Sequence, residues 1–192
     1  MGPLRLGFVT GTTPDTWARA WREQRRGPLE LVPVTEAEQE PLLRDGSLDL
    51  CLVRLPVDRT ALHLVELYDE LAVVVVPRDH FVTAASEVGL DDLNDEQLVL
   101  PHRSGWTPTA DQLGWPPMSE REAVDVIASG GGIALLPMSV ARLLQRKDVA
   151  AREVTDLPPT RVGLAWLVER DNERAQAMVG VVRGRTSRSS RG

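Results

Sequence analysis

The sequence predicts an α/β fold, in which short apolar strands alternate with amphipathic helices. The segment 120–137 shows the pattern. Apolar residues spaced three and four positions apart between 120 and 129 would lie on one face of a helix. Gly130-Gly131-Gly132 then ends that helix, because glycine takes a positive φ there without a Cβ penalty. The run 133–136 is apolar throughout and predicts a strand buried on both faces, so the segment forms half of a parallel α/β layer.

The first 53 residues show the same alternation. Gly27-Pro28 and Gly46 end the two helices expected there, and Thr13 or Asp15 is expected to cap the first of them. An order of strand, helix, strand, helix, strand predicts a parallel sheet with right-handed crossovers. The expected strands are 4–9, 29–34 and 48–53, and the expected helices are 16–26 and 36–45.

A second α/β unit is expected after the β-prone run Ala72–Val76, which Pro77 ends. Residues 78–94 are polar and irregular, with one helical turn at 90–93, and the Pro/Gly/Trp-rich segment 102–118 predicts loop. Ser139 is expected to cap a further helix. The remaining expected elements are strands at 62–67, 97–100, 133–136, 149–153 and 162–168, and helices at 139–145 and 173–182.

This order predicts two lobes. Lobe I comprises residues 1–75 and 163–184, lobe II comprises residues 76–162, and residues 185–192 form a basic, disordered tail. Only two β segments, near 73–77 and 161–166, would link the lobes. Proteins with two lobes and two links commonly hinge and bind a ligand between the lobes.

Composition excludes several classes of protein. The chain has 192 residues and a net charge of −6, although four arginines lie in its last ten residues, so the folded body is still more acidic. An acidic body repels a phosphate backbone, which argues against nucleic-acid binding by that body. No apolar run is long enough for a membrane helix, and the N-terminus resembles no secretory signal. With Cys51 as the only cysteine, we expect a cytoplasmic protein.

The sequence does not predict an enzyme. It lacks a Gly-x-Ser-x-Gly elbow, a P-loop, and the paired cysteine or histidine spacing of a metal site. Cys51 stands in the middle of an apolar strand, where a thiol is inert. We therefore expect neither a cofactor nor a metal.

Three segments together resemble the effector-binding domain of LysR-type transcriptional regulators. They are Leu4–Gly7, the segment LRDGSLDL at 43–50 and the segment ASGGGIALLP at 128–137. Each is weak alone, but their order and spacing are fairly specific, and the resemblance covers residues 4–182.

The resemblance implies a two-lobed type 2 periplasmic-binding-protein fold. Each lobe would hold a mixed, mostly parallel sheet flanked by helices, and two hinge strands would connect the lobes. A small effector would bind in the cleft between the lobes. Family members pair through the helices after strands one and three, a surface that would include Trp17 and Trp21 here. Two tryptophans on one helix are also explained as core residues, and we favour core for at least one of them.

The sequence departs from the family in two places. Residues 1–3 lead straight into the first strand, without the helix-turn-helix that normally precedes it. The segment between Pro101 and Glu120 is short, so lobe II is reduced, and Trp106 and Trp115 are expected to fill its core rather than stack on a ligand.

Ligands of open α/β sheets bind at the carboxyl ends of the strands, where helix N-termini also point. The stretches that follow the strands are also those where the resemblance places effector contacts. If Arg54 and Arg103 both face the ligand, it is a carboxylate or a phosphate. The expected ligand-binding residues are Thr10, Gly11, Thr12, Thr13, Thr35, Arg54, Leu55, Pro101, His102 and Arg103.

The leading hypothesis is an effector-sensing regulatory domain that binds a small, anionic metabolite and acts as a homodimer or as a heterodimer with a full-length regulator. Two alternatives stay open. One is a standalone dimerisation module that needs no ligand, and the other is a cytoplasmic solute-binding protein of the same fold.

Overall fold

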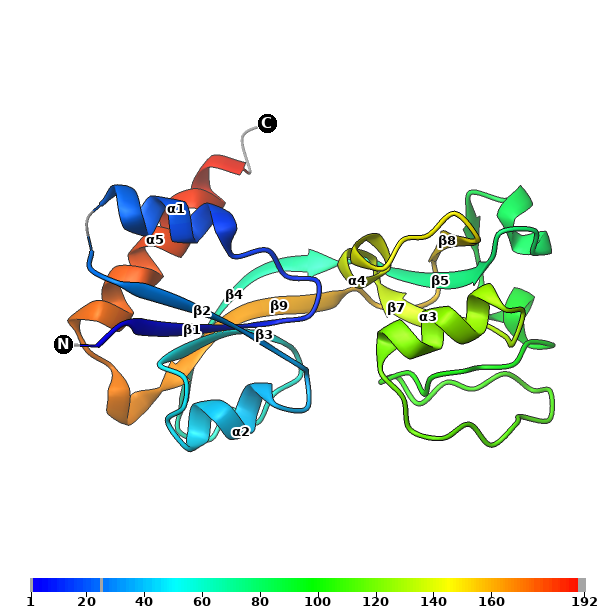
Figure 1. Ribbon diagram of the computed structural model, residues 1–192, viewed down its shortest axis with the longest axis horizontal. Coiled ribbons are helices and arrows are strands. Elements are labelled where there is room, and N and C mark those ends of the chain that lie inside the picture. The colour runs from blue at the N-terminus through cyan, green and yellow to red at the C-terminus, as the bar shows by residue number, and fades with distance from the viewer. Residues whose placement is uncertain (1, 25, 190–192) are drawn as a thin grey trace. The chain divides into compact units, whose positions relative to one another are not determined.

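A computed structural model describes residues 2–24 and 26–189 and divides the chain into two compact units (Figure 1). Unit 1 comprises Met1–Asp69 and Arg161–Gly192, and unit 2 comprises Glu70–Thr160. The chain therefore passes between the units twice, at the end of one long strand and at the start of another.

Unit 1 is built on a five-stranded mixed sheet of strand order β2-β1-β3-β9-β4. Strand β1 pairs in parallel with β2 and with β3, whereas β9 runs antiparallel to β3. The parallel strands β1, β2 and β3 consequently end at the same edge of the sheet. The strands are β1 (Leu4–Val9), β2 (Leu29–Val34), β3 (Leu50–Arg54), β4 (Leu62–Glu70) and β9 (Thr160–Leu167).

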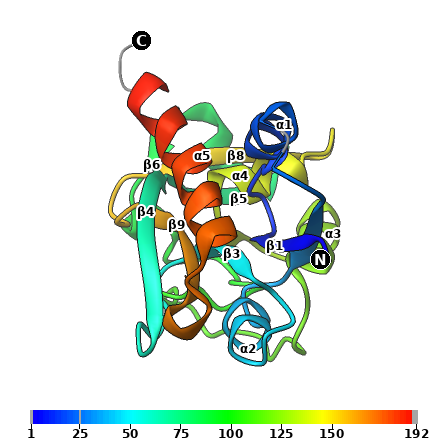
Figure 2. The same ribbon diagram turned by 90° about the vertical axis from the view of Figure 1, so that its left-hand side faces the viewer.

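Helices cover both faces of the unit 1 sheet. The helices α1 (Asp15–Glu23) and α5 (Glu173–Ser189) lie side by side on one face, and α2 (Gln39–Arg44) covers the other (Figures 1 and 2). Trp17 and Trp21 of α1 pack with Met178 of α5 in the core of the first face. The Trp21 indole N–H donates a 2.9 Å hydrogen bond to the Gly27 carbonyl oxygen. Both tryptophans are thus core residues, as favoured for at least one of them.

Unit 2 is built on a four-stranded sheet of order β6-β8-β5-β7. One apolar core lies on the side of its α-helices, and a second lies on the side of its 3₁₀ helices. Trp115 packs against the first core and Trp106 against the second, as expected for residues that fill a reduced lobe. The elements are β5 (Ala72–Pro77), β6 (Glu87–Val88), β7 (Ala134–Pro137), β8 (Val149–Val154), α3 (Glu120–Ala128), α4 (Met138–Leu143) and the 3₁₀ helices η1 (Phe81–Ala84) and η2 (Leu90–Leu93); a third, η3 (Val168–Arg170), belongs to unit 1.

The helix α3 forms where the apolar spacing predicts it. Ser119 caps its N-terminus, and the Glu122 carboxylate accepts a 2.7 Å hydrogen bond from the Ser119 N–H. At the other end, Gly130 (φ 81°) donates to the Ile127 carbonyl oxygen, and Gly132 adopts φ 146°. A Cβ on Gly132 would overlap the Gln97 carbonyl oxygen, which accepts a 2.8 Å hydrogen bond from the Ile133 N–H. Glycine is therefore required at 132 on two counts.

Several expected details are wrong. In unit 2, β5 pairs antiparallel with both β7 and β8, so that sheet is not mostly parallel. The parallel crossover from β7 through α4 to β8 does form, but β5 lies between the two strands and runs in the opposite direction. Residues 97–100 form only an isolated bridge, from Leu98 to Ile133.

The expected helix ends also differ. Pro14 and Pro137 occupy the N-cap positions of α1 and α4 without a side-chain cap, in place of Thr13, Asp15 and Ser139. The last helix continues to Ser189, beyond the expected end at Val182 and into the segment expected to be a disordered tail. Arginine, frequent in this segment, is a good helix former. Residues 190–192 of that segment lie outside the described residues.

Candidate functional site

The candidate site in unit 1 is the edge of the sheet where β1, β2 and β3 end. Thr10–Thr13 follow β1, Thr35 follows β2, and Arg54 closes β3. The strand register pairs Val9 with Val34 across β1 and β2, so these stretches leave the sheet at the same edge. The structure thereby brings together the expected residues that follow the three parallel strands of unit 1.

The buried Arg54 side chain connects the stretch after β1 with the stretch after β2. It has no exposed surface, and its guanidinium lies 2.8 Å from the Glu36 carboxylate and 3.1 Å from the Thr10 carbonyl oxygen. The Gln39 side chain holds the backbone of Arg54 through two hydrogen bonds, of 2.9 and 3.1 Å. Because the positive charge is buried and paired, Arg54 fixes the position of the loop that follows β1 and does not present its charge to solvent.

The threonines of this edge differ in what their hydroxyls do. The Thr12 hydroxyl is buried and donates to the Val9 carbonyl oxygen at 2.7 Å, which stabilises the turn. The Thr35 N–H and hydroxyl both donate to Glu38 at 2.8 Å and lower the pKa of that carboxyl group. The Thr10 and Thr13 hydroxyls, by contrast, form no hydrogen bond within the part of the chain that the structure describes.

The start of α1 adds hydrogen-bond donors to this edge. Gly11 adopts φ 89°, so the chain turns sharply between β1 and the helix. No side chain caps α1 at its N-cap residue, Pro14, so the backbone N–H groups of Asp15 and Trp17 in its first turn are directed towards an acceptor beyond the helix start. Together with the Thr10 and Thr13 hydroxyls, they form a donor-rich surface that suits a carboxylate or another oxygen-bearing group.

The expected residues of unit 2 lie in the loop 101–118. Pro101 and Arg103 are exposed, and His102 is half-buried. The His102 Nδ1 lies 2.8 Å from the Ser104 hydroxyl oxygen, and the Ser104 N–H also points to it. Leu55, in unit 1, donates its N–H to the Arg161 carbonyl oxygen and precedes a cis peptide bond to Pro56.

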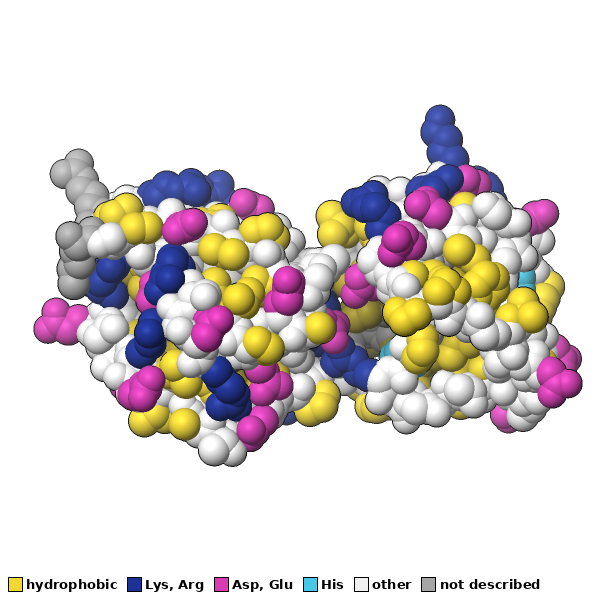
Figure 3. Space-filling view, turned by 60° about the horizontal axis from the view of Figure 1, so that its bottom comes forward, with side chains coloured by type: hydrophobic (Ala, Val, Ile, Leu, Met, Phe, Trp, Pro, Cys, Tyr) yellow, Lys and Arg dark blue, Asp and Glu magenta, His cyan; other side chains and the backbone are white. Residues whose placement is uncertain are grey.

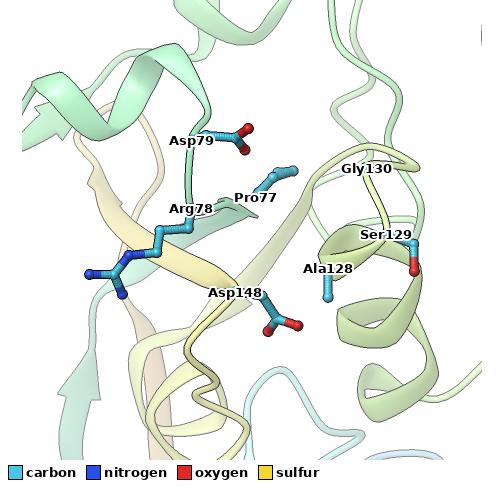
Figure 4. Close-up of a pocket in the computed structure, with 7 residues that line it drawn as sticks. All are labelled: Pro77, Arg78, Asp79, Ala128, Ser129, Gly130 and Asp148. Atoms are coloured by element: carbon cyan, nitrogen blue, oxygen red, sulfur yellow. The ribbon is translucent and has the colours of Figure 1, made fainter.

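Unit 2 carries an open hollow of about 640 Å³ beside the end of α3 (Figure 4). Arg78 points away from it and donates to the Lys147 carbonyl oxygen. Asp148 points into it, but its carboxylate is paired with Arg146 at 2.8 Å. Ser129 points away as well, so the side chains do not converge on a common point.

The described residues contain no cluster that could hold a metal ion, and none of their helices is long and apolar enough to cross a membrane. Burial raises the pKa of the Cys51 thiol to about 12, which keeps it protonated and unreactive at neutral pH. Basic and acidic side chains alternate over the visible face of unit 1, without a continuous basic stripe (Figure 3).

The LysR substrate binding domain model matches residues 1–187. The chain belongs to this family. Its members are regulatory domains and not enzymes. The HTH-type transcriptional regulator AlsR of Bacillus subtilis is 25% identical over 185 residues, which cover 87% of this chain and 60% of AlsR. The domain thus spans about three fifths of the length of such a regulator.

Solved structures of the family share the fold. The BenM effector-binding domain with its effector benzoate superposes with a TM-score of 0.78, at 20% identity, over 98% of this chain and 93% of that one. An OxyR regulatory domain variant from Pseudomonas aeruginosa gives a TM-score of 0.73 at 23% identity, with both chains fully covered. The two-lobed type 2 periplasmic-binding-protein fold expected from the sequence is confirmed.

Sequence reasoning missed Glu36 and Gln39, which hold Arg54 in place. Glu36 follows Thr35 directly after β2, so the rule that selected Thr35 could have selected it too. The signal for Gln39 is weaker, because a polar residue in the first turn of a helix is normally exposed, whereas only 5% of Gln39 is.

Proposed function

We propose that this domain senses a small effector through the carboxyl-end edge of the unit 1 sheet, as the regulatory part of a cytoplasmic transcriptional regulator. The effector offers a carboxylate or another oxygen-bearing acceptor to the Thr10 and Thr13 hydroxyls and to the N–H groups at the start of α1. The observation that carries this proposal is the uncapped helix start beside two hydroxyls without a partner in the described chain.

Arg54 has a positioning role in this proposal. Its ion pair with Glu36 cancels its charge, and its bond to the Thr10 carbonyl oxygen holds the loop with the Thr10 and Thr13 donors outward. The effector therefore binds through hydrogen bonds from neutral donors more than through a bare cation. Pro101, His102 and Arg103 remain predicted contacts supplied by unit 2.

The partners in this proposal follow from the relatives. AlsR is a transcriptional regulator, and the domain spans three fifths of such a protein. Effector binding would be passed to DNA through a second copy of the domain or through a full-length partner, while the acidic folded body itself makes no contact with DNA. The hinge strands would be β4 and β9.

A thermal-shift screen of small carboxylates tests the proposal. Because Thr13 is exposed, Thr13→Val removes one hydroxyl donor with little effect on folding. We expect a stabilising hit whose affinity falls about fivefold to tenfold in Thr13→Val, the loss of roughly one hydrogen bond. Thr107→Val, on an exposed residue of the unit 2 loop, is the matched control and should bind like the unaltered domain.

Two results would count against this function. A screen without any stabilising compound would favour a dimerisation module without a ligand. An effector that binds Thr10→Val and Thr13→Val as tightly as the unaltered domain would place its site elsewhere.

A further inference from the structure

A second cavity, of about 190 Å³, lies within unit 2 between α4 and the sheet. Its walls come from β5, β8, α3 and α4, all of which belong to this unit. The lining is mainly apolar and includes Val75, Val124, Met138, Ala141, Leu144 and Val149. None of the residues of the unit 1 edge contributes to it.

The cavity exists because small side chains stand where larger ones would fill it. Ala141 faces it from α4 and Ala151 from β8, opposite Val75 in the strand register. The residues around them belong to the apolar core on this side of the sheet. A water molecule in such a space is poorly stabilised, because a buried water needs hydrogen bonds to two to four polar partners.

The rim of the cavity is basic. Arg142, Gln145 and Arg146 line it from the end of α4 onward. Arg146 is already paired with Asp125 and Asp148. The exposed Arg142 side chain, in contrast, forms no ion pair or hydrogen bond with any residue in the described part of the chain. An apolar cavity therefore opens beside one arginine whose charge is uncompensated.

We propose that this cavity binds a small amphipathic carboxylate, with its hydrocarbon part against Met138, Ala141 and Ala151 and its carboxylate on Arg142. The volume matches one six-membered ring or a branched chain of similar size, since an apolar cavity of about 150 Å³ accommodates benzene. Arginine is suited to the charged end, because its planar guanidinium binds carboxylates through two parallel hydrogen bonds. The cavity is a second binding site, separate from the unit 1 edge.

The methionine methyl groups allow the site to be located directly. Met138 lines the cavity, whereas Met178 is buried in the core of unit 1. We would titrate the methyl-labelled domain with cyclohexanecarboxylate and follow the methionine signals by NMR, assigned through Met138→Leu. The Met138 signal should shift and saturate while that of Met178 stays unchanged. Cyclohexanecarboxamide, of the same shape but neutral, should bind at least about fivefold more weakly.

Two variants test the two halves of the site. Arg142→Gln should weaken carboxylate binding about tenfold and remove the preference over the carboxamide, without a change in folding, because the side chain is exposed. Arg121→Gln, on an exposed arginine of α3 that does not line the cavity, is the matched control. Ala151→Leu should fill the cavity and abolish binding of both compounds, with thermal unfolding measured to confirm that the variant is folded.

Several outcomes would overturn the proposal. An unchanged Met138 signal would do so, as would equal binding of the acid and the amide. A Met138 shift that depends on protein concentration, and not on the added acid, would show instead that a side chain of a second copy fills the cavity.

Discussion

The glycine turn after α3 gives the sharpest prediction, because two neighbouring glycines differ in what a methyl group would meet. In Gly132→Ala the residue would keep φ near 146°, a region essentially reserved for glycine, at a cost of about 1–3 kcal/mol. The new Cβ would also displace the Gln97 carbonyl oxygen. The hydrogen bonds from Ile133 to Gln97 and from Val99 to Ile133 would then weaken, at about 1 kcal/mol each. We expect a total loss of about 3–5 kcal/mol.

Gly130→Ala is the matched control. Gly130 also has a positive φ, of 81°, but nothing lies within 4 Å of an added Cβ. Only the backbone cost of about 1–2 kcal/mol applies. Gly114→Ala, at a position with open space and no positive φ, should change stability by less than about 1 kcal/mol.

Urea unfolding, followed by circular dichroism, measures the three free energies, with hydrogen exchange at the Val99 and Ile133 amides as a local probe of unit 2. A loss of unfolding free energy in Gly132→Ala no larger than that in Gly130→Ala would show that the Cβ at 132 meets no obstacle. Full protection of the Val99 and Ile133 amides in Gly132→Ala would show the same.

Two further predictions concern the cap of α3 and the buried thiol. Ser119→Ala should destabilise the domain by about 1 kcal/mol in the same urea assay, because Ser119 accepts from the Glu122 N–H, whereas Ser104→Ala, in an exposed loop, should cost less. Cys51 should resist a thiol reagent at pH 8 in the folded domain and react rapidly in urea; equal rates would contradict its burial. Since folding raises the pKa of Cys51 from 9.0 to about 12, only the unfolded thiol ionises between these values. This contribution to stability is complete below pH 9 and is lost as the pH rises towards 12, an effect that Cys51→Ala should remove.

Sequence patterns predicted where the strands and helices lie along the chain better than they predicted which strands pair and in which direction. The strand 4–9 and the helix that begins near Glu120 could be read from periodicity, because each places its apolar residues on the face or faces that it buries. The direction of β5 could not, since a continuous apolar run is equally compatible with parallel and antiparallel partners. A strand was expected at 97–100, where only the isolated bridge at Leu98 forms, because a short apolar run does not determine how far strand pairing continues.

At the candidate site, sequence likewise predicted the positions of residues along the chain but not the contacts of their side chains. Strand ends could be located along the sequence, and Thr10, Thr35 and Arg54 do meet at one edge of the sheet. Sequence could not show that Arg54 is buried against Glu36, because ion pairing depends on which neighbouring loop supplies the carboxylate. The expectation of an anionic ligand rested on Arg54 and Arg103 together, and the pairing of Arg54 with Glu36 removes the support that comes from unit 1.

The insertion of unit 2 into unit 1 has a consequence for the order in which the domain is made. The strand β9 lies between β3 and β4 in the finished sheet, and its register pairs Val162 with Arg54. During synthesis β1 to β4 leave the ribosome first, and the whole of Glu70–Thr160 follows before β9 appears. Unit 2 is contiguous, so all of its residues are present while unit 1 still lacks the interior strand β9. Its early collapse would bring β9 close to the gap between β3 and β4, shortening a closure that otherwise spans more than half the chain.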